Sequence, residues 1–92
     1  MPKMTIEQAH VLEPSIVRKN LEGLQVRLAE KYGLTVSWTS NTEATIKRSG
    51  VSGTIRCEPQ KVLINLDLSF ALTPLKGTIE QRIRQELTQA LT

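Results

Sequence analysis

The sequence contains one histidine, His10, and one cysteine, Cys57, the residue types that often provide a metal ligand, a general base or a nucleophile. A zinc site takes several nitrogen or thiolate ligands, and no second such ligand stands near His10 in the sequence. No nucleophile motif such as G-x-S-x-G is present either. We therefore expect a structural or surface role for His10, and we predict no metal site.

Cys57 falls on the inward side of a predicted strand, where a cysteine packs as a small hydrophobic side chain. A reactive thiolate would instead need exposure and a nearby cation or helix N-terminus. We therefore expect Cys57 to pack in the core. A single cysteine also excludes an internal disulfide bond and is typical of a protein in a reducing cytoplasm.

The carboxylates are scattered over outward positions of the predicted elements. Paired acid–base catalysis needs two groups that face each other in one cleft, and no such pair can be assembled from these positions. The segment "GVSG" (50–53) joins two strands and does not precede a helix, so it does not match a phosphate-binding loop. We predict no catalytic residues, no enzymatic activity and no cofactor.

Two residues are candidates for binding a partner or ligand. Trp38, the sole tryptophan, is predicted to point inward, where it would either anchor the core or form the wall of a ligand pocket between sheet and helices. Lys76 lies in "LTPLKGTIE" (72–80), beside a predicted helix N-terminus whose dipole disfavours cations. No capping or packing rule explains a lysine there, so Lys76 is either solvated or part of a binding surface.

Apolar periodicity predicts the elements that position these residues. Met4 and Ile6 alternate with polar neighbours in a short first strand. A helix then opens around Pro14 and carries an apolar stripe at spacings of four, three and four, and it ends at Gly33. The stripe consists of Val17, Leu21, Leu24 and Leu28.

Four alternating runs follow, separated by turns at "SNTE" (40–43), "RSGVSG" (48–53) and "EPQK" (58–61). The strongest period-two pattern lies in the fourth run. The predicted inward positions are Leu34, Val36 and Trp38; Ala44 and Ile46; Val51, Gly53, Ile55 and Cys57; and Val62, Ile64, Leu66, Leu68 and Phe70.

A second helix is predicted after Gly77. Thr78 and Gln81 match a capping box, in which each side chain bonds to a free backbone N–H of the first turn. Pro74 is expected to stop the preceding strand, and Gly77 to turn the chain just before the cap. The apolar stripe of this helix consists of Ile79, Ile83, Leu87 and Leu91, with Ala90 beside it.

The element order is therefore β-α-β-β-β-β-α, which predicts an α+β fold. Short turns between consecutive strands favour an antiparallel sheet, and one apolar face on each element places both helices on one face of that sheet. The chain is expected to form a single domain over residues 1–92. Such a chain buries roughly 60–65% of its unfolded surface, which leaves little room for a deep pocket.

The surface pattern limits the classes of partner. The net charge is +3, and the 12 cations are interleaved with 9 acids, so nucleic-acid binding is not favoured. No apolar run is long enough to span a membrane, and "MPKMTIEQAH" lacks the apolar core of a signal peptide. Val26 and Leu63 are apolar at predicted exposed positions, which makes a homodimer a hypothesis.

Several segments, in their order and spacing, resemble the polyhydroxyalkanoic acid system protein family. They are His10, "LAEKYGL" (28–34), Trp38, "KRSGVSGTI" (47–55), the strand 62–70 and "LTPLKGTIEQRI" (72–83). The resemblance covers nearly the whole chain. The sequence departs from the family pattern at Ile46, where an aromatic residue is expected, and at "SNTE", where a Gly-Asp type of turn is expected.

This resemblance implies a bacterial, cytoplasmic, non-enzymatic accessory or binding protein of the polyhydroxyalkanoate system. Such a protein would act at the storage granule or on its proteins. It implies no mechanism and no set of site residues. Two alternatives remain open at this point: a small module, similar to a helix-grip fold, that binds an apolar acyl ligand, and a nucleic-acid-linked regulator of the polyester genes.

Overall fold

The computed structural model describes residues 3–91 and has the predicted β-α-β-β-β-β-α order. The strands are β1 (Lys3–Ala9), β2 (Thr35–Trp38), β3 (Glu43–Arg48), β4 (Val51–Glu58) and β5 (Lys61–Leu68). The helices are α1 (Pro14–Tyr32) and α2 (Lys76–Leu91), with a short 3₁₀ helix, η1 (Phe70–Leu75), before α2.

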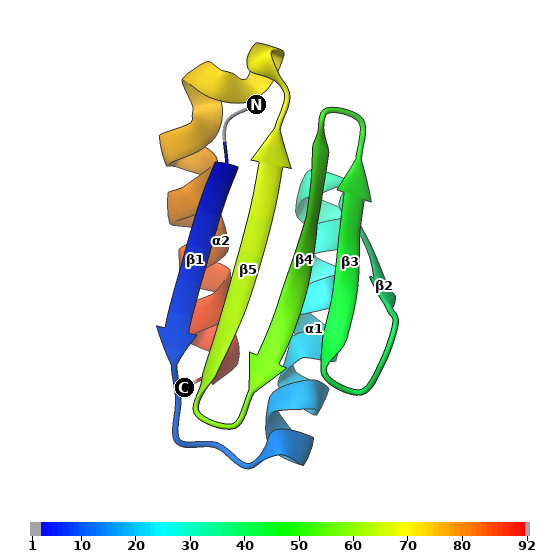
Figure 1. The fold of residues 1–92 in the computed structure, drawn as a ribbon, viewed down its shortest axis with the longest axis vertical. Helices are drawn as coiled ribbons and strands as arrows, with labels where there is room; N and C mark the ends of the chain where they lie inside the picture. The colour runs from blue at the N-terminus through cyan, green and yellow to red at the C-terminus, as the bar shows by residue number, and fades with distance from the viewer. Residues whose placement is uncertain (1–2, 92) are drawn as a thin grey trace.

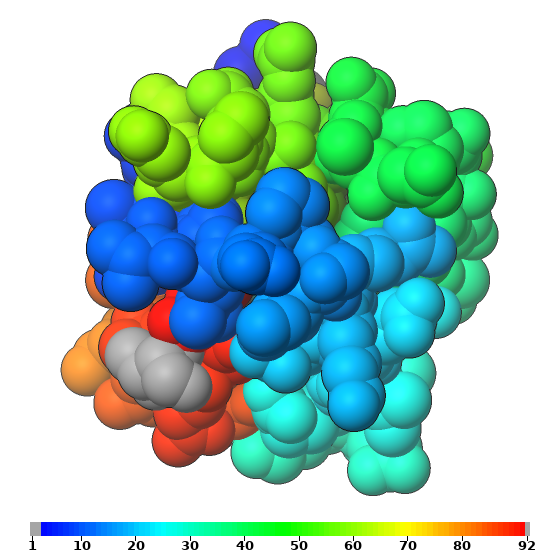
Figure 2. All heavy atoms as spheres, turned by 90° about the horizontal axis from the view of Figure 1, so that it is seen from below, coloured from blue at the N-terminus to red at the C-terminus, as the bar shows by residue number. Residues whose placement is uncertain are grey.

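All strands form one antiparallel sheet in the order β1-β5-β4-β3-β2, and both helices cover the same face of it (Figure 1). Viewed along the strands, the sheet and the helices form two layers, with the β1–α1 connection lying across this end of the molecule (Figure 2). The fold predicted from the sequence is confirmed, including the placement of both helices on one face.

The core lies between these two layers. The predicted stripe of α1 is buried, and so are the predicted inward positions of β5 as far as Leu68. Gly33 ends α1 with a φ of 68°, and the N–H of Leu34 donates to the carbonyl of Leu28, so the left-handed glycine closes the helix as the sequence predicts. Among residues 3–91, no helix is long and apolar enough to cross a membrane.

The segment after β5 differs from the prediction. The alternation predicts Phe70 as the fifth inward residue of the strand, but its side chain is 75% exposed. The sheet ends before this residue, because the partner of Leu68 is Val51, the first residue of β4. The N–H of Ser69 makes one more bond, to the carbonyl of Gly50 in the β3–β4 turn, and the chain then coils into η1.

The start of the second helix also differs from the prediction. α2 begins at Lys76 and continues directly from η1, so Pro74 lies inside the 3₁₀ helix, and Gly77 lies in α2 without a positive φ. The N–H of Lys76 donates to the carbonyl of Thr73. The helix therefore begins two residues before Thr78, and its first N–H already has an acceptor in η1, so α2 has no free end at the predicted Thr78–Gln81 capping box.

Gly53 fixes how closely β4 and β5 approach each other. A Cβ at this position would collide with the backbone oxygen of Asn65 and lie 2.7 Å from Cδ2 of Leu66, which fills the space above the glycine. Gly23, in the middle of α1, has a different environment. Its Cβ would meet only the flexible Arg27 side chain, with Nη1 at 3.7 Å.

We expect opposite effects of alanine at these two glycines. Gly53→Ala should lower the free energy of unfolding by about 1–3 kcal/mol, because β4 or Leu66 must move to make room. Gly23→Ala should raise it by about 0.5–1 kcal/mol, because alanine has the higher helix propensity. Urea denaturation of both variants checks this pair, and equal effects at the two positions would contradict the close β4–β5 approach.

Candidate functional site

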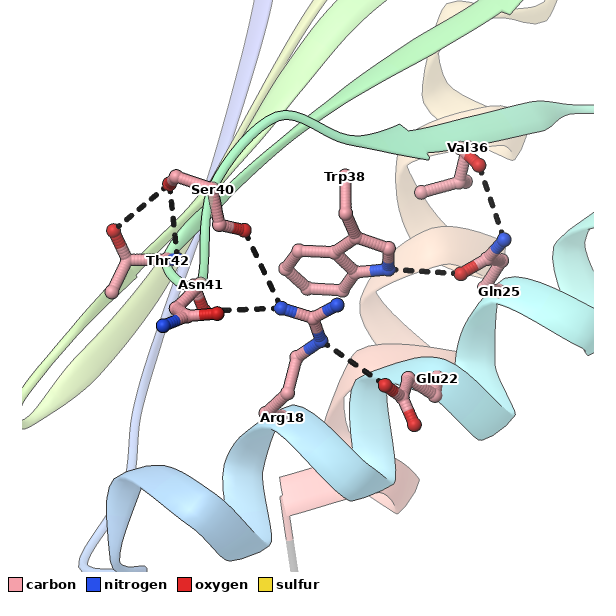
Figure 3. A network of polar contacts seen from close by, with 8 residues as sticks. All are labelled: Arg18, Glu22, Gln25, Val36, Trp38, Ser40, Asn41 and Thr42. Carbon is pink, nitrogen blue, oxygen red and sulfur yellow. Dashed lines mark hydrogen bonds and ion pairs between the residues drawn. The ribbon is translucent and has the colours of Figure 1, made fainter.

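Trp38 joins the sheet edge to α1. Its indole Nε1–H donates to Oε1 of Gln25 at 2.9 Å, and the amide of Gln25 donates in turn to the carbonyl of Val36 at 3.1 Å (Figure 3). The guanidinium of Arg18 stacks on the ring, with its Cζ 3.6 Å from the ring centroid. The side chain is half-buried and packs against the core, so it anchors β2 to α1.

Arg18 connects this tryptophan to the β2–β3 turn. Its Nη1 donates to the carbonyls of Ser40 and Asn41, at 3.4 and 3.3 Å, and its Nε pairs with Glu22 at 3.2 Å (Figure 3). The polar groups around Trp38 are therefore occupied by neighbours in the fold. A binding role for Trp38 stays a prediction. Its structural role is to connect β2 to α1.

Glu86 is the buried carboxylate that the sequence analysis missed. It lies on α2, is 7% exposed, and accepts bonds from Arg27 Nε at 2.7 Å and Lys31 Nζ at 2.9 Å, both on α1. The hydrogen bond from Lys31, followed by that from Arg27, lowers the pKa of Glu86 and outweighs the opposite effect of burial. This cluster ties the two helices together.

A signal for this cluster was present in the sequence. Arg27 and Lys31 lie four residues apart and share one face of α1, while Glu86 lies between Ile83 and Leu87 of the apolar stripe. A charged residue so close to a buried stripe indicates an ion pair with another element. Only the folded structure shows which element provides that pair.

Glu86→Gln should lower the free energy of unfolding at pH 7 by about 1.5–3 kcal/mol, because two charge-assisted hydrogen bonds are weakened. The folded pKa of Glu86 lies below its ordinary value of 4.5, so the contribution is complete above that value. It is lost as the pH falls through the folded pKa, and the two proteins should converge in stability there.

The matched control for that experiment is Glu80→Gln, which removes the exposed pair between Glu80 and Arg84 on α2. An exposed pair with four-residue spacing contributes only about 0.3–0.5 kcal/mol. Thermal or urea unfolding between pH 3 and pH 7 measures both variants. A pH-independent loss at Glu86, or equal losses at the two sites, would contradict the assignment.

The two potentially reactive side chains, His10 and Cys57, are buried or partly buried. His10 is 8% exposed, and its Nδ1 accepts a hydrogen bond from the N–H of Leu12 at 3.1 Å, which places the proton of the neutral ring on Nε2. Within residues 3–91, Nε2 has no partner. Cys57 packs against the core, and burial raises the pKa of its thiol, so the thiol is not activated as a nucleophile.

A small apolar pocket lies beside η1, the segment drawn at the upper end of Figure 1. Its volume is about 180 Å³. Its lining comes from the end of α1, the α1–β2 connection, strands β3, β4 and β5, η1 and the first turns of α2. The lining residues are Tyr32, Leu34, Arg48, Val51, Leu66, Leu72, Leu75, Ile79, Arg82 and Ile83.

Two arginines are the charged groups of this pocket. Arg48, at the end of β3, donates through Nη1 to the carbonyl of Tyr32 at 2.8 Å, where α1 ends. A cation at this helix terminus also interacts favourably with the helix dipole. Arg82 is exposed on α2, and the salt bridges found among residues 3–91 do not include it.

The two residues predicted to bind lie outside this lining. Trp38 lies on β2 in the Arg18 cluster, and the structure does not bring it to the pocket. Lys76 is half-buried at the start of α2 and directly follows Leu75, which does line the pocket. Neither Arg48 nor Arg82 is a candidate on sequence grounds, although Arg82 directly precedes Ile83 of the apolar stripe.

The structure is therefore a two-layer α+β fold, and its candidate site is a small apolar pocket whose lining includes two arginines. The chain matches the family described as "Putative polyhydroxyalkanoic acid system protein" over residues 4–91. It belongs to this family, as the resemblance in its sequence indicated. No curated protein matches the chain.

A solved structure, that of TTHA0849 from Thermus thermophilus, is similar over 98% of this chain and 94% of its own. The sequence identity is 14% and the TM-score is 0.43. Because the TM-score is this low, we draw nothing about the fold or function of this chain from the similarity.

Proposed function

We propose that this chain is a non-enzymatic accessory protein of the polyhydroxyalkanoate system that binds at the storage granule or to the granule's proteins in the cytoplasm. The observation that carries this proposal is the family match over residues 4–91, which spans every helix and strand of the fold. The lone cysteine is consistent with a reducing compartment.

The state of the polar side chains supports binding rather than catalysis. Nδ1 of His10 is engaged by a backbone N–H, and the raised pKa of Cys57 disfavours the thiolate. The carboxylate of Glu86 is held by Arg27 and Lys31. His10 and Glu86 are buried, and Cys57 is partly buried, so none of the three side chains lies on an open surface.

The η1 end of the molecule is the surface we assign to the granule. Phe70 is 75% exposed and Leu75 is 51% exposed, on a helix that buries none of its residues. Lys76 follows them directly and is half-buried. A polyester surface offers apolar chain, which an aromatic ring or a leucine can contact, and carbonyl acceptors, to which an ammonium group can donate.

Nucleic-acid binding has less support. Five cations pair with carboxylates of the chain, namely Arg18, Arg27, Lys31, Lys61 and Arg84. Nucleic-acid binding relies instead on cations gathered on one face and free to contact phosphates.

A homodimer stays a prediction. Val26 is 54% exposed on α1, whereas Leu63 lies on the sheet face opposite the helices, with Glu7 and Arg56 as its cross-strand neighbours. The two residues therefore do not form one apolar patch.

Co-sedimentation with native granules tests the proposed function. We expect enrichment of the wild-type protein over a control protein of similar size and net charge. Phe70→Ser should reduce the bound fraction about tenfold if the ring is buried on the polyester, because burial of a phenylalanine side chain contributes about 1.5–3 kcal/mol. Lys76→Ala should weaken binding with little change in stability.

Matched controls are Val26→Ser and Lys19→Ala, which change an exposed apolar residue and an exposed lysine on α1, away from η1. Both should bind like the wild type. Absence of enrichment over the control protein would overturn the granule proposal. Equal losses in the η1 and α1 variants would show that the contact does not involve this end of the molecule.

A further inference from the structure

We propose that the pocket beneath η1 binds a short acyl chain that ends in a carboxylate, with the alkyl tail between sheet and helices and the carboxylate at Arg82 and Arg48. This assignment rests on the proposed function only for the source of the ligand, since hydroxyalkanoic acids are the units of the polymer in the family description. The walls, the volume and the charge of the pocket are independent of that function.

The walls fit an alkyl tail. Apart from Tyr32 and the two arginines, all lining side chains are aliphatic, and they come from the α1–β2 connection, the sheet, η1 and α2. A buried cavity of roughly 150 Å³ lined by aliphatic and aromatic groups stays dry and accepts benzene. The present volume of about 180 Å³ therefore suits a tail of about six carbons. A long-chain fatty acid exceeds that volume.

The charge at the edge fits a carboxylate. None of the ten lining residues is acidic, and two are arginines. A guanidinium offers a planar set of donors that matches a carboxylate, and the bond from Arg48 to the carbonyl of Tyr32 leaves most of its donors available. Arg82 lies outside the salt bridges of residues 3–91 and is the stronger candidate for direct contact.

The η1 helix covers the pocket. It is tied to the sheet at its start and is half-exposed near its end, at Leu75. The bond from Ser69 N–H to the carbonyl of Gly50 ties the start of η1 to the β3–β4 turn. A Cβ on Gly50 would lie 3.2 Å from Cδ1 of Leu72, so the absence of a side chain there lets Leu72 close this side. Leu75, on the other side, is half-exposed, so its apolar surface can be covered by a ligand.

Titration of the ¹⁵N-labelled full chain with hexanoate, followed by NMR, tests the assignment. We expect saturable shift changes at the amides of Leu72, Leu75 and Ile79. Hexanamide has the same tail without the charge and should bind at least tenfold more weakly. Arg82→Ala should weaken hexanoate binding about tenfold or more and leave hexanamide binding nearly unchanged. Arg84→Ala, an exposed α2 arginine outside the pocket, should bind hexanoate like the wild type.

Three results would overturn the proposal. They are no saturable shift at these amides in 10–20 mM hexanoate (about 10⁻² M, where even millimolar binding is visible), equal binding of hexanoate and hexanamide, and equal losses in the two arginine variants. Arg82 is exposed, so its variant is expected to fold. Ile79→Phe, which fills the pocket, should abolish binding as an additional test.

A comparison of two ligands distinguishes the source of the bound acid. Tighter binding of 3-hydroxyhexanoate than of hexanoate supports a unit of the polyester, and equal binding supports a short fatty acid in the same pocket. The experiment also separates the two proposals of function, because hexanoate binding without granule co-sedimentation retains the pocket and removes the granule role. Granule binding without any hexanoate signal retains the granule role and removes the pocket proposal.

Discussion

Coverage of a five-stranded apolar face by only two helices is the constraint on which the rest of this structure depends. The sheet has one apolar face, and α1 and α2 must exclude water from all of it. Buried side chains from all five strands and from both helices form one core cluster between the two layers. At the edge strand β2, Trp38 and Arg18 complete the cover, and at the end of β5 it is completed by η1.

The two helices also have to be held side by side, and polar groups do this at little cost to the core. Glu86 is buried on the α2 side, while Arg27 and Lys31 reach it from partly exposed positions on α1. Because the cations stay partly in water, their desolvation is small, and the carboxylate still receives two short hydrogen bonds. A pair buried on both sides would cost more for the same bonds.

Local patterns predicted most of the fold, because each helix and strand has a clear apolar period and short turns determine the antiparallel order. They failed where the outcome depends on a distant segment. Phe70 continues the alternation of β5, but its outward position is set by the point at which β4 begins. Thr78 matches a cap, but α2 begins earlier, at Lys76, whose N–H already donates to the carbonyl of Thr73 in η1. Arg48 and Arg82 could not be predicted as pocket residues, because they are far apart in the sequence and line one pocket only in the folded chain.

The η1 segment answers the question that Lys76 raises. A lysine at a free helix N-terminus is unfavourable, but Lys76 continues a 3₁₀ helix and has an acceptor for its N–H, so the chain has no free helix end there. The same junction leaves Phe70 and Leu75 exposed, and Leu75 lines the apolar pocket that also contains Arg48 and Arg82. Burial of such side chains would favour stability, so their exposure at this end is the feature on which the proposed granule contact rests.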